Sequence, residues 1–338
     1  MPMKKAASGP ATRLLSCSIL LLGMNLLAGC DAPVKNGSCT IGTLGRLPLY
    51  SSHNVPVVRA TINKHPVLFE VDTGAYNSVL GEEYAGMLEL SYSGGMVRAI
   101  GVKGTEFQRI VQVDDIGLGG ATNTNHAFVM TSQPFHPTRP PLPPLVGMIG
   151  AEILLATDLV IDMPHHQMQL LDMKRCPYPT PLWKGTMHTV RIDRDLDDMK
   201  LHLHFALDGG EPIRAVFDTG ASRTVIPLRM ARKLGVTDAM LKNDRSTTDV
   251  QAVGDDKVTA YHHRFRTLTL GDFTIHNPEV IIMDNDTLDY ALFGADFLRH
   301  HRVWITTENT MYVQHISEIP RDENQAPPSS ATSETGAK

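Results

Sequence analysis

The chain has 338 residues, of which 42% are hydrophobic, and its formal net charge is −5. This length can bury two modest hydrophobic cores, and the lack of a basic surplus excludes the electrostatic footprint of a nucleic-acid-binding protein. After the N-terminal segment, no apolar run reaches the ~20 residues that a membrane-spanning helix needs.

The first 29 residues have the pattern of an export signal. MKKAASGPATR supplies positive charge, LLSCSILLLGMNLLAG supplies an apolar core, and Cys30 follows at once. LAGC at 27–30 resembles the bacterial lipobox, in which the cysteine is lipidated and becomes the mature N-terminus. We therefore expect a lipoprotein signal peptide at 1–29, lipidation at Cys30 and a tether at 30–45. A plain secretory signal with an incidental cysteine is the alternative.

This reading predicts a protein anchored in the bacterial cell envelope by its lipid and facing the periplasm. Asp31, directly after Cys30, resembles an inner-membrane retention signal. That rule does not hold in every lineage, so the choice between inner and outer membrane stays open.

The rest of the chain contains an internal repeat. Asp-Thr-Gly-Ala occurs at 72–75 and again at 218–221, each time between apolar runs. Further matches follow in the same order in both copies: RAIG at 98–101 with QAVG at 251–254, GLGG at 117–120 with TLGD at 269–272, and MIGAEIL at 148–154 with LFGADFL at 292–298. A repeat of this length indicates two homologous halves rather than one short motif found twice.

We place the two halves at 46–173 and 185–316, joined by a Pro-rich linker at 174–184. Each half is predicted to be mostly β. A hairpin leads into each Asp-Thr-Gly, and helical apolar spacing follows it. We expect an all-β protein of two β-barrel halves about a pseudo-twofold axis, each with a short helix. The tail at 317–338 lacks apolar periodicity and is predicted to be disordered.

Two equivalent halves that pack about such an axis bring Asp72 and Asp218 together. Two carboxylates a few ångströms apart share one proton, because both cannot ionise cheaply. Such a dyad can hold a water molecule, take a proton from it and donate a proton to a substrate carbonyl. Asp72 and Asp218 are therefore the predicted catalytic residues of a peptide hydrolysis that has no covalent intermediate.

The other motif residues have predicted supporting roles. Gly74 and Gly220 let the backbone pass close to the dyad and offer amides to it, while Thr73 and Thr219 can hydrogen-bond across the axis. Gly150 and Gly294 let the later segment of each half pass beneath the catalytic loop, where a side chain would clash.

At these residues the chain resembles the aspartic peptidases, and within them the retropepsin-like branch. DTGAS at 218–222 fits the retropepsin pattern, and both halves lie in one chain, as in pepsins. The resemblance implies an aspartic endopeptidase without a cofactor, acting on an extended protein or peptide substrate as a monomer with an internal pseudo-dimer. One departure is Tyr76, which stands where Ser222 stands in the second copy.

The resemblance also implies glycine-rich flaps over the substrate cleft. The segments at 99–106, with Gly101 and Gly104, and at 252–259, with Gly254, are the predicted flaps, and Tyr76 could line the cleft. Ordinary surface hairpins are the alternative interpretation of both segments.

Cys39 and Cys176 are the cysteines that remain after Cys30, and an oxidising periplasm favours a disulfide between them over two free thiols. Fifteen histidines invite a metal site, but no acid or cysteine partners occur at useful spacing, so none is predicted.

Two functions compete with the peptidase. A pseudo-peptidase could bind peptides or envelope proteins in the same cleft without cutting them, although both Asp-Thr-Gly triplets are intact. A purely structural envelope lipoprotein would leave the duplicated motif unexplained.

If the chain is a peptidase, Ala75 and Ala221 cannot donate a side-chain hydrogen bond to the dyad, and this predicts a rate optimum near pH ~4–6.

Overall fold

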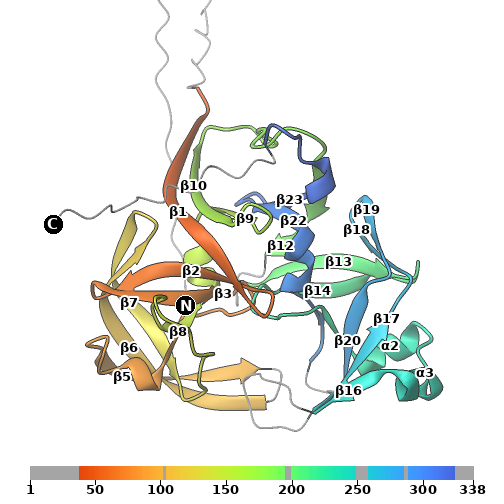
Figure 1. Ribbon diagram of the computed structural model, residues 1–338, viewed down its shortest axis with the longest axis horizontal. Coiled ribbons are helices and arrows are strands. Elements are labelled where there is room, and N and C mark those ends of the chain that lie inside the picture. The colour runs from red at the N-terminus through yellow and green to blue at the C-terminus, as the bar shows by residue number, and fades with distance from the viewer. Residues whose placement is uncertain (1–37, 102–103, 195–198, 249–257, 285–287, 324–338) are drawn as a thin grey trace, which may run out of the picture. The chain divides into compact units, whose positions relative to one another are not determined.

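The computed structural model describes residues 38–101, 104–194, 199–248, 258–284 and 288–323 (Figure 1). The predicted signal peptide, Cys30 and Gly254 of the second predicted flap lie outside these residues. The described part of the chain consists of strands with a few short helices, so the predicted mostly-β fold class is confirmed.

The N-terminal half forms one sheet around its motif. Strands β1, β2 and β3 pair antiparallel in chain order, and β8 then pairs in parallel with β3 and antiparallel with β4. The sheet continues through β7, β6 and β5. The elements are β1 (Thr40–Ser52), β2 (Val55–Ile62), β3 (His65–Val71), β4 (Val79–Gly81), η1 (Glu82–Tyr84), β5 (Ser91–Gly101), β6 (Gly104–Leu118), β7 (Ala121–Thr131), β8 (Leu145–Ile149) and α1 (Ala151–Leu154).

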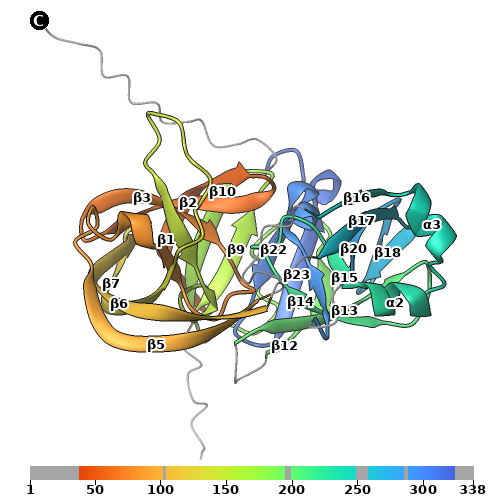
Figure 2. The same cartoon turned by 90° about the horizontal axis from the view of Figure 1, so that it is seen from below.

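The C-terminal half repeats this arrangement. Strand β13 pairs antiparallel with β14, and β14 pairs in parallel with β21, as β3 does with β8. Its elements are β12 (Asp193–Arg194), β13 (Leu201–Leu207), β14 (Ile213–Phe217), β15 (Val225–Pro227), α2 (Leu228–Lys233), α3 (Asp238–Asn243), β16 (Arg245–Thr247), β17 (Thr259–Arg264), β18 (Thr267–Leu270), β19 (Phe273–His276), β20 (Glu279–Asp284), β21 (Ala291–Phe293) and η2 (Ala295–His300). Figure 2 shows α2 and α3 on the side of this sheet away from β22 and β23.

The last strands of both halves join in a shared sheet. Its strands are β9 (Asp158–Asp162), β10 (Gln167–Lys174), β11 (His188–Arg191), β22 (His301–Ile305) and β23 (Thr310–His315). The order is β11-β23-β22-β9-β10-β1, and β9 pairs antiparallel with β22 at the centre. Val160 pairs there with Trp304, and their spacing, 304 − 160 = 144, equals that of Gly150 and Gly294. Residues equivalent in the repeat are therefore paired, which places the pseudo-twofold axis at this pair.

Hydrophobic packing on both faces of the sheets holds this arrangement together. The main core runs through both halves and includes Phe69, Phe128, Phe217 and Phe293, each at most 1% exposed. A smaller cluster packs around the fully buried Trp304 on the shared sheet. Burial of apolar side chains on this scale is the main force that keeps the strands, and with them the motif loops, in register.

The folded part of the chain extends beyond the predicted boundaries at both ends. Strand β1 begins at Thr40, inside the predicted tether, because its first residues pair with β10. At the other end, η3 (Ile316–Glu318) and the buried Ile319 follow β23, and Arg302 donates a 2.8 Å hydrogen bond to Glu323. The assignment of a disordered tail from residue 317 is therefore wrong for its first residues, which are held by these contacts.

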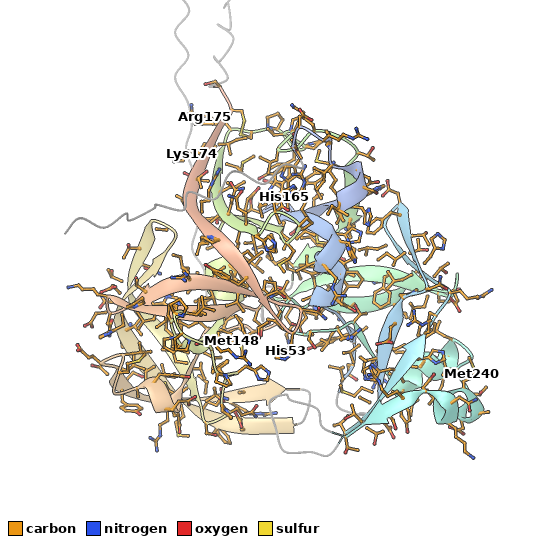
Figure 3. The ribbon with its side chains drawn as sticks, in the orientation of Figure 1. His53, Met148, His165, Lys174, Arg175 and Met240 are labelled. Carbon is orange, nitrogen blue, oxygen red and sulfur yellow. A yellow bond between two sulfur atoms is a disulfide. The ribbon has the colours of Figure 1, made fainter. Side chains whose placement is uncertain are left out.

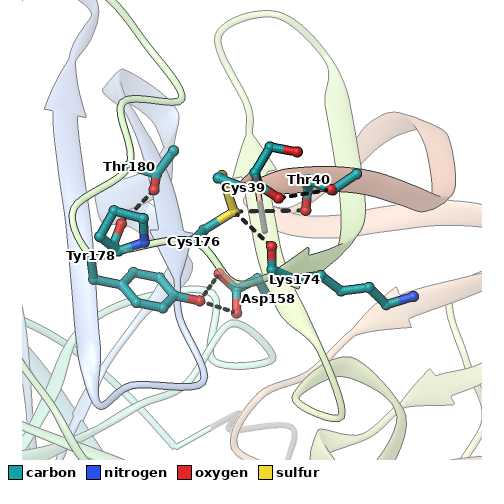
Figure 4. Close-up of a disulfide and its surroundings, with 9 residues drawn as sticks. Cys39, Thr40, Asp158, Lys174, Cys176, Tyr178 and Thr180 are labelled. Atoms are coloured by element: carbon teal, nitrogen blue, oxygen red, sulfur yellow. Dashed lines mark hydrogen bonds between the residues drawn. A yellow bond between two sulfur atoms is a disulfide. The ribbon is translucent and has the colours of Figure 1, made fainter. Parts of the chain in front are cut away.

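Cys39 and Cys176 form a disulfide that joins the start of β1 to the linker after β10 (Figure 4). Next to it in the linker, the Tyr178 hydroxyl donates a 3.0 Å hydrogen bond to Asp158 of β9.

Within the residues that the structure describes, no helix is long and apolar enough to cross a membrane.

Candidate active site

Each motif aspartate follows directly after a strand that pairs in parallel with a neighbour. The Asp72 amide, just beyond β3, donates a 3.0 Å hydrogen bond to the Ile149 carbonyl at the end of β8. The Asp218 amide, just beyond β14, donates at 3.0 Å to the Phe293 carbonyl at the end of β21. The strand pairs therefore fix the start of both motif loops by the same backbone contact.

Within each loop, two backbone amides hold the aspartate side chain. The amides of Gly74 and Ala75 donate to Asp72 Oδ1 at 2.8 and 3.0 Å. In the second loop, the amides that follow Asp218 donate to its Oδ1 at 3.0 and 2.9 Å. Because these bonds favour the charged form, each loop is built to carry a carboxylate in a fixed direction.

Thr73 and Thr219 join the two loops to each other. The Thr73 amide donates to Thr219 Oγ1 at 3.1 Å, and the Thr219 amide donates to Thr73 Oγ1 at 3.2 Å. Each hydroxyl in turn donates across the axis, from Thr73 to the Phe217 carbonyl at 2.6 Å and from Thr219 to the Val71 carbonyl at 2.5 Å. Both threonines are fully buried, so these four bonds face no competition from water.

Gly74 and Gly220 allow the carboxylates to approach the opposite loops. A Cβ atom on Gly74 would lie 2.6 Å from Oδ1 of Asp218, and a Cβ atom on Gly220 would lie 2.6 Å from Oδ1 of Asp72. Any side chain at either glycine would therefore displace the carboxylate of the opposite motif. The same distances establish that each aspartate lies against the loop of the other half.

Burial and mutual repulsion set the protonation of the pair. Burial raises the pKa of Asp72 well above its usual range, the charge of Asp218 raises it further, and the amides of Gly74 and Ala75 oppose both. Burial also raises the pKa of Asp218, against the Ala221 amide, a hydrogen bond from Asp72 and the positive charge of Lys200. The two groups titrate together, as one pair that shares a proton.

Gly150 and Gly294 occupy tight positions beneath the two loops. Their amides donate to the hydroxyls of Ser78 at 2.9 Å and Thr224 at 3.1 Å. A Cβ atom on Gly150 would lie 2.8 Å from the Ser78 amide, and one on Gly294 would lie 2.7 Å from the Thr224 amide. Glycine is therefore required at both positions by the close approach of the backbones.

An acid two residues after each of these glycines supports the site, and it was not predicted from the sequence. Glu152 accepts a 2.7 Å hydrogen bond from the Ser78 amide, and Asp296 accepts a 3.0 Å bond from the Thr224 amide. Burial raises the pKa of Asp296. The matched acids in GAE and GAD of the repeat were the signal that could have found this pair.

The predicted flap and cleft residues are only partly described. Gly101 and Gly104 pair at the tip of the β5–β6 hairpin, visible in Figure 1, and Gly254 lies outside the described residues. Phe107 on this hairpin is 71% exposed, and Tyr76 is 45% exposed.

Among the described residues, no group of three or more His, Cys, Asp or Glu could hold a metal ion.

Comparisons with known proteins found a matching family and similar solved structures. The sequence model of the aspartyl protease family matches residues 58–153 and 204–297, which together exceed half of the chain and contain one motif each. Among solved structures, the chain is similar to an aspartic proteinase from Irpex lacteus, with a TM-score of 0.49 and 13% sequence identity over 84% of this chain and all of that chain. A search of curated proteins found no match.

Proposed function

We propose that this chain, which belongs to the aspartyl protease family, is an endopeptidase in which Asp72 and Asp218 activate a water molecule to hydrolyse a peptide bond. One observation carries the proposal: each carboxylate lies against the glycine of the opposite loop, while Thr73 and Thr219 hold the loops together. This arrangement gives two acids with raised pKa values and one shared proton, which suits acid and base roles in one step.

In the proposed reaction, Asp218 is the base and Asp72 the acid. Asp218 takes a proton from the water while the water oxygen bonds to the substrate carbonyl carbon, and Asp72 gives its proton to the carbonyl oxygen. The tetrahedral intermediate then collapses, the peptide C–N bond breaks, and a proton passes from the dyad to the leaving amine. The amides that hold each Oδ1 keep both carboxylates in place during these transfers, so little reorganisation is needed.

The test is the cleavage of a diverse peptide library by the purified full-length protein, with products identified by mass spectrometry. The wild type should cut, and Asp218→Asn should lose at least roughly 10³-fold in rate, because the remaining carboxyl has no partner that shares its proton. Asp238→Asn is the matched control, since that side chain is 92% exposed in the same half and should leave cleavage unchanged. Peptides that bind to the wild type without being cut would favour the non-catalytic binding module instead.

We further propose that the protein is anchored in the bacterial envelope through a lipid on Cys30, facing the periplasm. The support is the charged and apolar segment before Cys30 and the small residues next to it. Cells grown with a radioactive fatty acid should label the wild type but not Cys30→Ala, which should be released from the membrane or stay unprocessed. An unlabelled wild type found wholly in the soluble fraction would contradict the anchor.

A further inference from the structure

Glu70 breaks the symmetry of the two halves next to the dyad. It lies on β3 two residues before Asp72, and the repeat places Val216 in the same position before Asp218. Both residues have the same strand pairing, because Glu70 lies between Val57 and Met148 as Val216 lies between His202 and Leu292. An acid therefore replaces an apolar residue at one of two positions that have the same strand pairing.

The alternation of β3 places the Glu70 side chain on the same side as the catalytic carboxylate. Val67, Phe69 and Val71 point into the main core, so Glu70 and Asp72 point to the opposite face. Two residues along a strand span about 7 Å. This is within reach of a substrate side chain next to the scissile bond, and the charge of Glu70 already acts on Asp72.

The surroundings of Glu70 are apolar. Val57 of β2 and Met148 of β8 flank it in register, and directly paired residues share a sheet face. Of these two residues, Met148 is labelled in Figure 3. Leu68, one step back on the same face, packs with Val57 in a small hydrophobic cluster. Burial here raises the pKa of Glu70 to about 7.

Glu70 has no evident role in holding the fold together. Within the residues that the structure describes, its carboxylate has no hydrogen-bond or ion-pair partner, and the titratable group placed next to it is another acid, Asp72. A partly buried carboxylate between apolar walls costs free energy unless a cation or donor meets it. Such a group fits a ligand that brings the missing positive charge and an apolar stem.

We propose that Glu70 binds the Lys or Arg side chain of a substrate residue that flanks the scissile bond on the side of the N-terminal half. Lys and Arg match the site, since their methylene groups can lie along Val57 and Met148 while the charged end meets the carboxylate. This inference rests on the proposed peptidase function and names its substrate class.

The C-terminal half should prefer an apolar residue on the other side of the bond. Val216 and Leu292 belong to an apolar cluster there, which Ala221 and Tyr290 cover. Lys200 lies on this side and donates a 3.0 Å hydrogen bond to the Tyr290 hydroxyl. Its positive charge disfavours a second basic residue in the substrate. Cleavage is therefore expected between one basic and one apolar residue.

Two peptides that differ only by Lys or norleucine at this position test the proposal with the full-length protein. At pH 7, where Glu70 is partly ionised, the wild type should prefer the Lys peptide in kcat/KM by roughly 30-fold or more, as expected for a partly desolvated charge pair. Glu70→Val, which installs the residue of the other half, should reverse the preference, and Glu70→Gln should abolish it. Glu89→Gln is the control, because that side chain is 76% exposed in the same half and should leave the preference intact.

A binding measurement separates this proposal from the proposed catalysis. In the Asp218→Asn background, fluorescence anisotropy should give tighter binding of the Lys peptide, and Glu70→Gln should remove the difference. A wild type that cuts both peptides equally, together with equal affinities in this background, would overturn the role of Glu70 and leave the peptidase function standing. A wild type that cuts no peptide would overturn the peptidase function first, and the specificity with it.

Discussion

Thr73 and Thr219 exchange hydrogen bonds across the pseudo-twofold axis, each backbone amide donating to the hydroxyl of the other residue, at 3.1 and 3.2 Å. The two hydroxyls also donate to carbonyls of the opposite strand ends. Four buried donors are thus satisfied between the halves. These bonds, together with the strands that carry the loops, hold Asp72 and Asp218 in their relative position.

Removing these hydroxyls should loosen the dyad. Thr73→Val or Thr219→Val keeps the shape of the side chain but leaves a buried amide and a buried carbonyl unpaired, at a cost of about 1–3 kcal/mol each. Urea unfolding should show this loss, and kcat should fall together with it. Thr→Ser at the same positions keeps the hydroxyl and should retain most of the activity. Unchanged stability in both Val variants would contradict the role of the cross-linked loops.

A hydroxyl added at residues 75 and 221 should shift the pH profile of the cleavage rate. Ala75 and Ala221 donate only their backbone amides to the dyad. Burial raises both pKa values, which is consistent with a bell-shaped rate profile centred near pH ~4–6. The double variant Ala75→Ser/Ala221→Ser adds a donor to each charged form, so the profile should move toward acid by about one pH unit. A wild-type optimum near pH 2, or a shift of the variant toward alkali, would contradict this explanation.

Glu70 should make the protein less stable as pH rises. The pKa of Glu70 is about 7 in the folded protein, whereas its ordinary value, taken for the unfolded chain, is 4.5. Between pH 4.5 and 7 the folded state therefore keeps a proton that the unfolded state has lost. Stability therefore falls as pH rises from 4.5 to 7. Glu70→Gln should be close to the wild type at pH 4.5 and about 3 kcal/mol more stable at pH 8.

Denaturant unfolding at both pH values measures this difference. Glu89→Gln serves as the control, because it removes an exposed acid from the same half. A stabilisation by Glu70→Gln that is equal at pH 4.5 and pH 8 would show that Glu70 does not titrate between them.

The disulfide should contribute to stability through the long loop that it closes. Cys39 and Cys176 are 137 residues apart, and they join the start of β1 to the linker that follows β10. The double variant Cys39→Ser/Cys176→Ser should lose about 2–5 kcal/mol of stability, because the unfolded chain regains the conformations that the cross-link removes. Thermal unfolding with and without reductant should show the loss in the wild type and no effect of reductant in the variant.

Much of the site was predictable from the sequence because it depends on short motifs that occur twice. The repeat identified Asp72 and Asp218, and the lack of a side chain at the motif glycines pointed to close backbone contacts. Glu152 and Asp296 were missed although GAE and GAD align, because an acid next to a glycine has many possible roles.

Other features depend on pairing between distant segments, which local patterns do not encode. The shared sheet joins β9 to β22 across the two halves, and nothing in either strand alone indicates its partner. The same holds for the segment that ends in Glu323, which has little apolar periodicity and is held by Arg302 of β22. Glu70 was overlooked because an acid within a strand acquires meaning only when its neighbours are known to be apolar.

We propose that Asp72 and Asp218 act as one unit, and a double-mutant cycle measures whether their effects on the rate are coupled. We would measure kcat/KM on a single peptide for the wild type, Asp72→Asn, Asp218→Asn and the double variant. Because the two carboxyl groups share one proton, each single change should cost at least roughly 10³-fold, and the double variant should lose no more than the single variants do. If the two losses multiply in the double variant, or if either single variant keeps substantial activity, the two residues act independently and the dyad is contradicted.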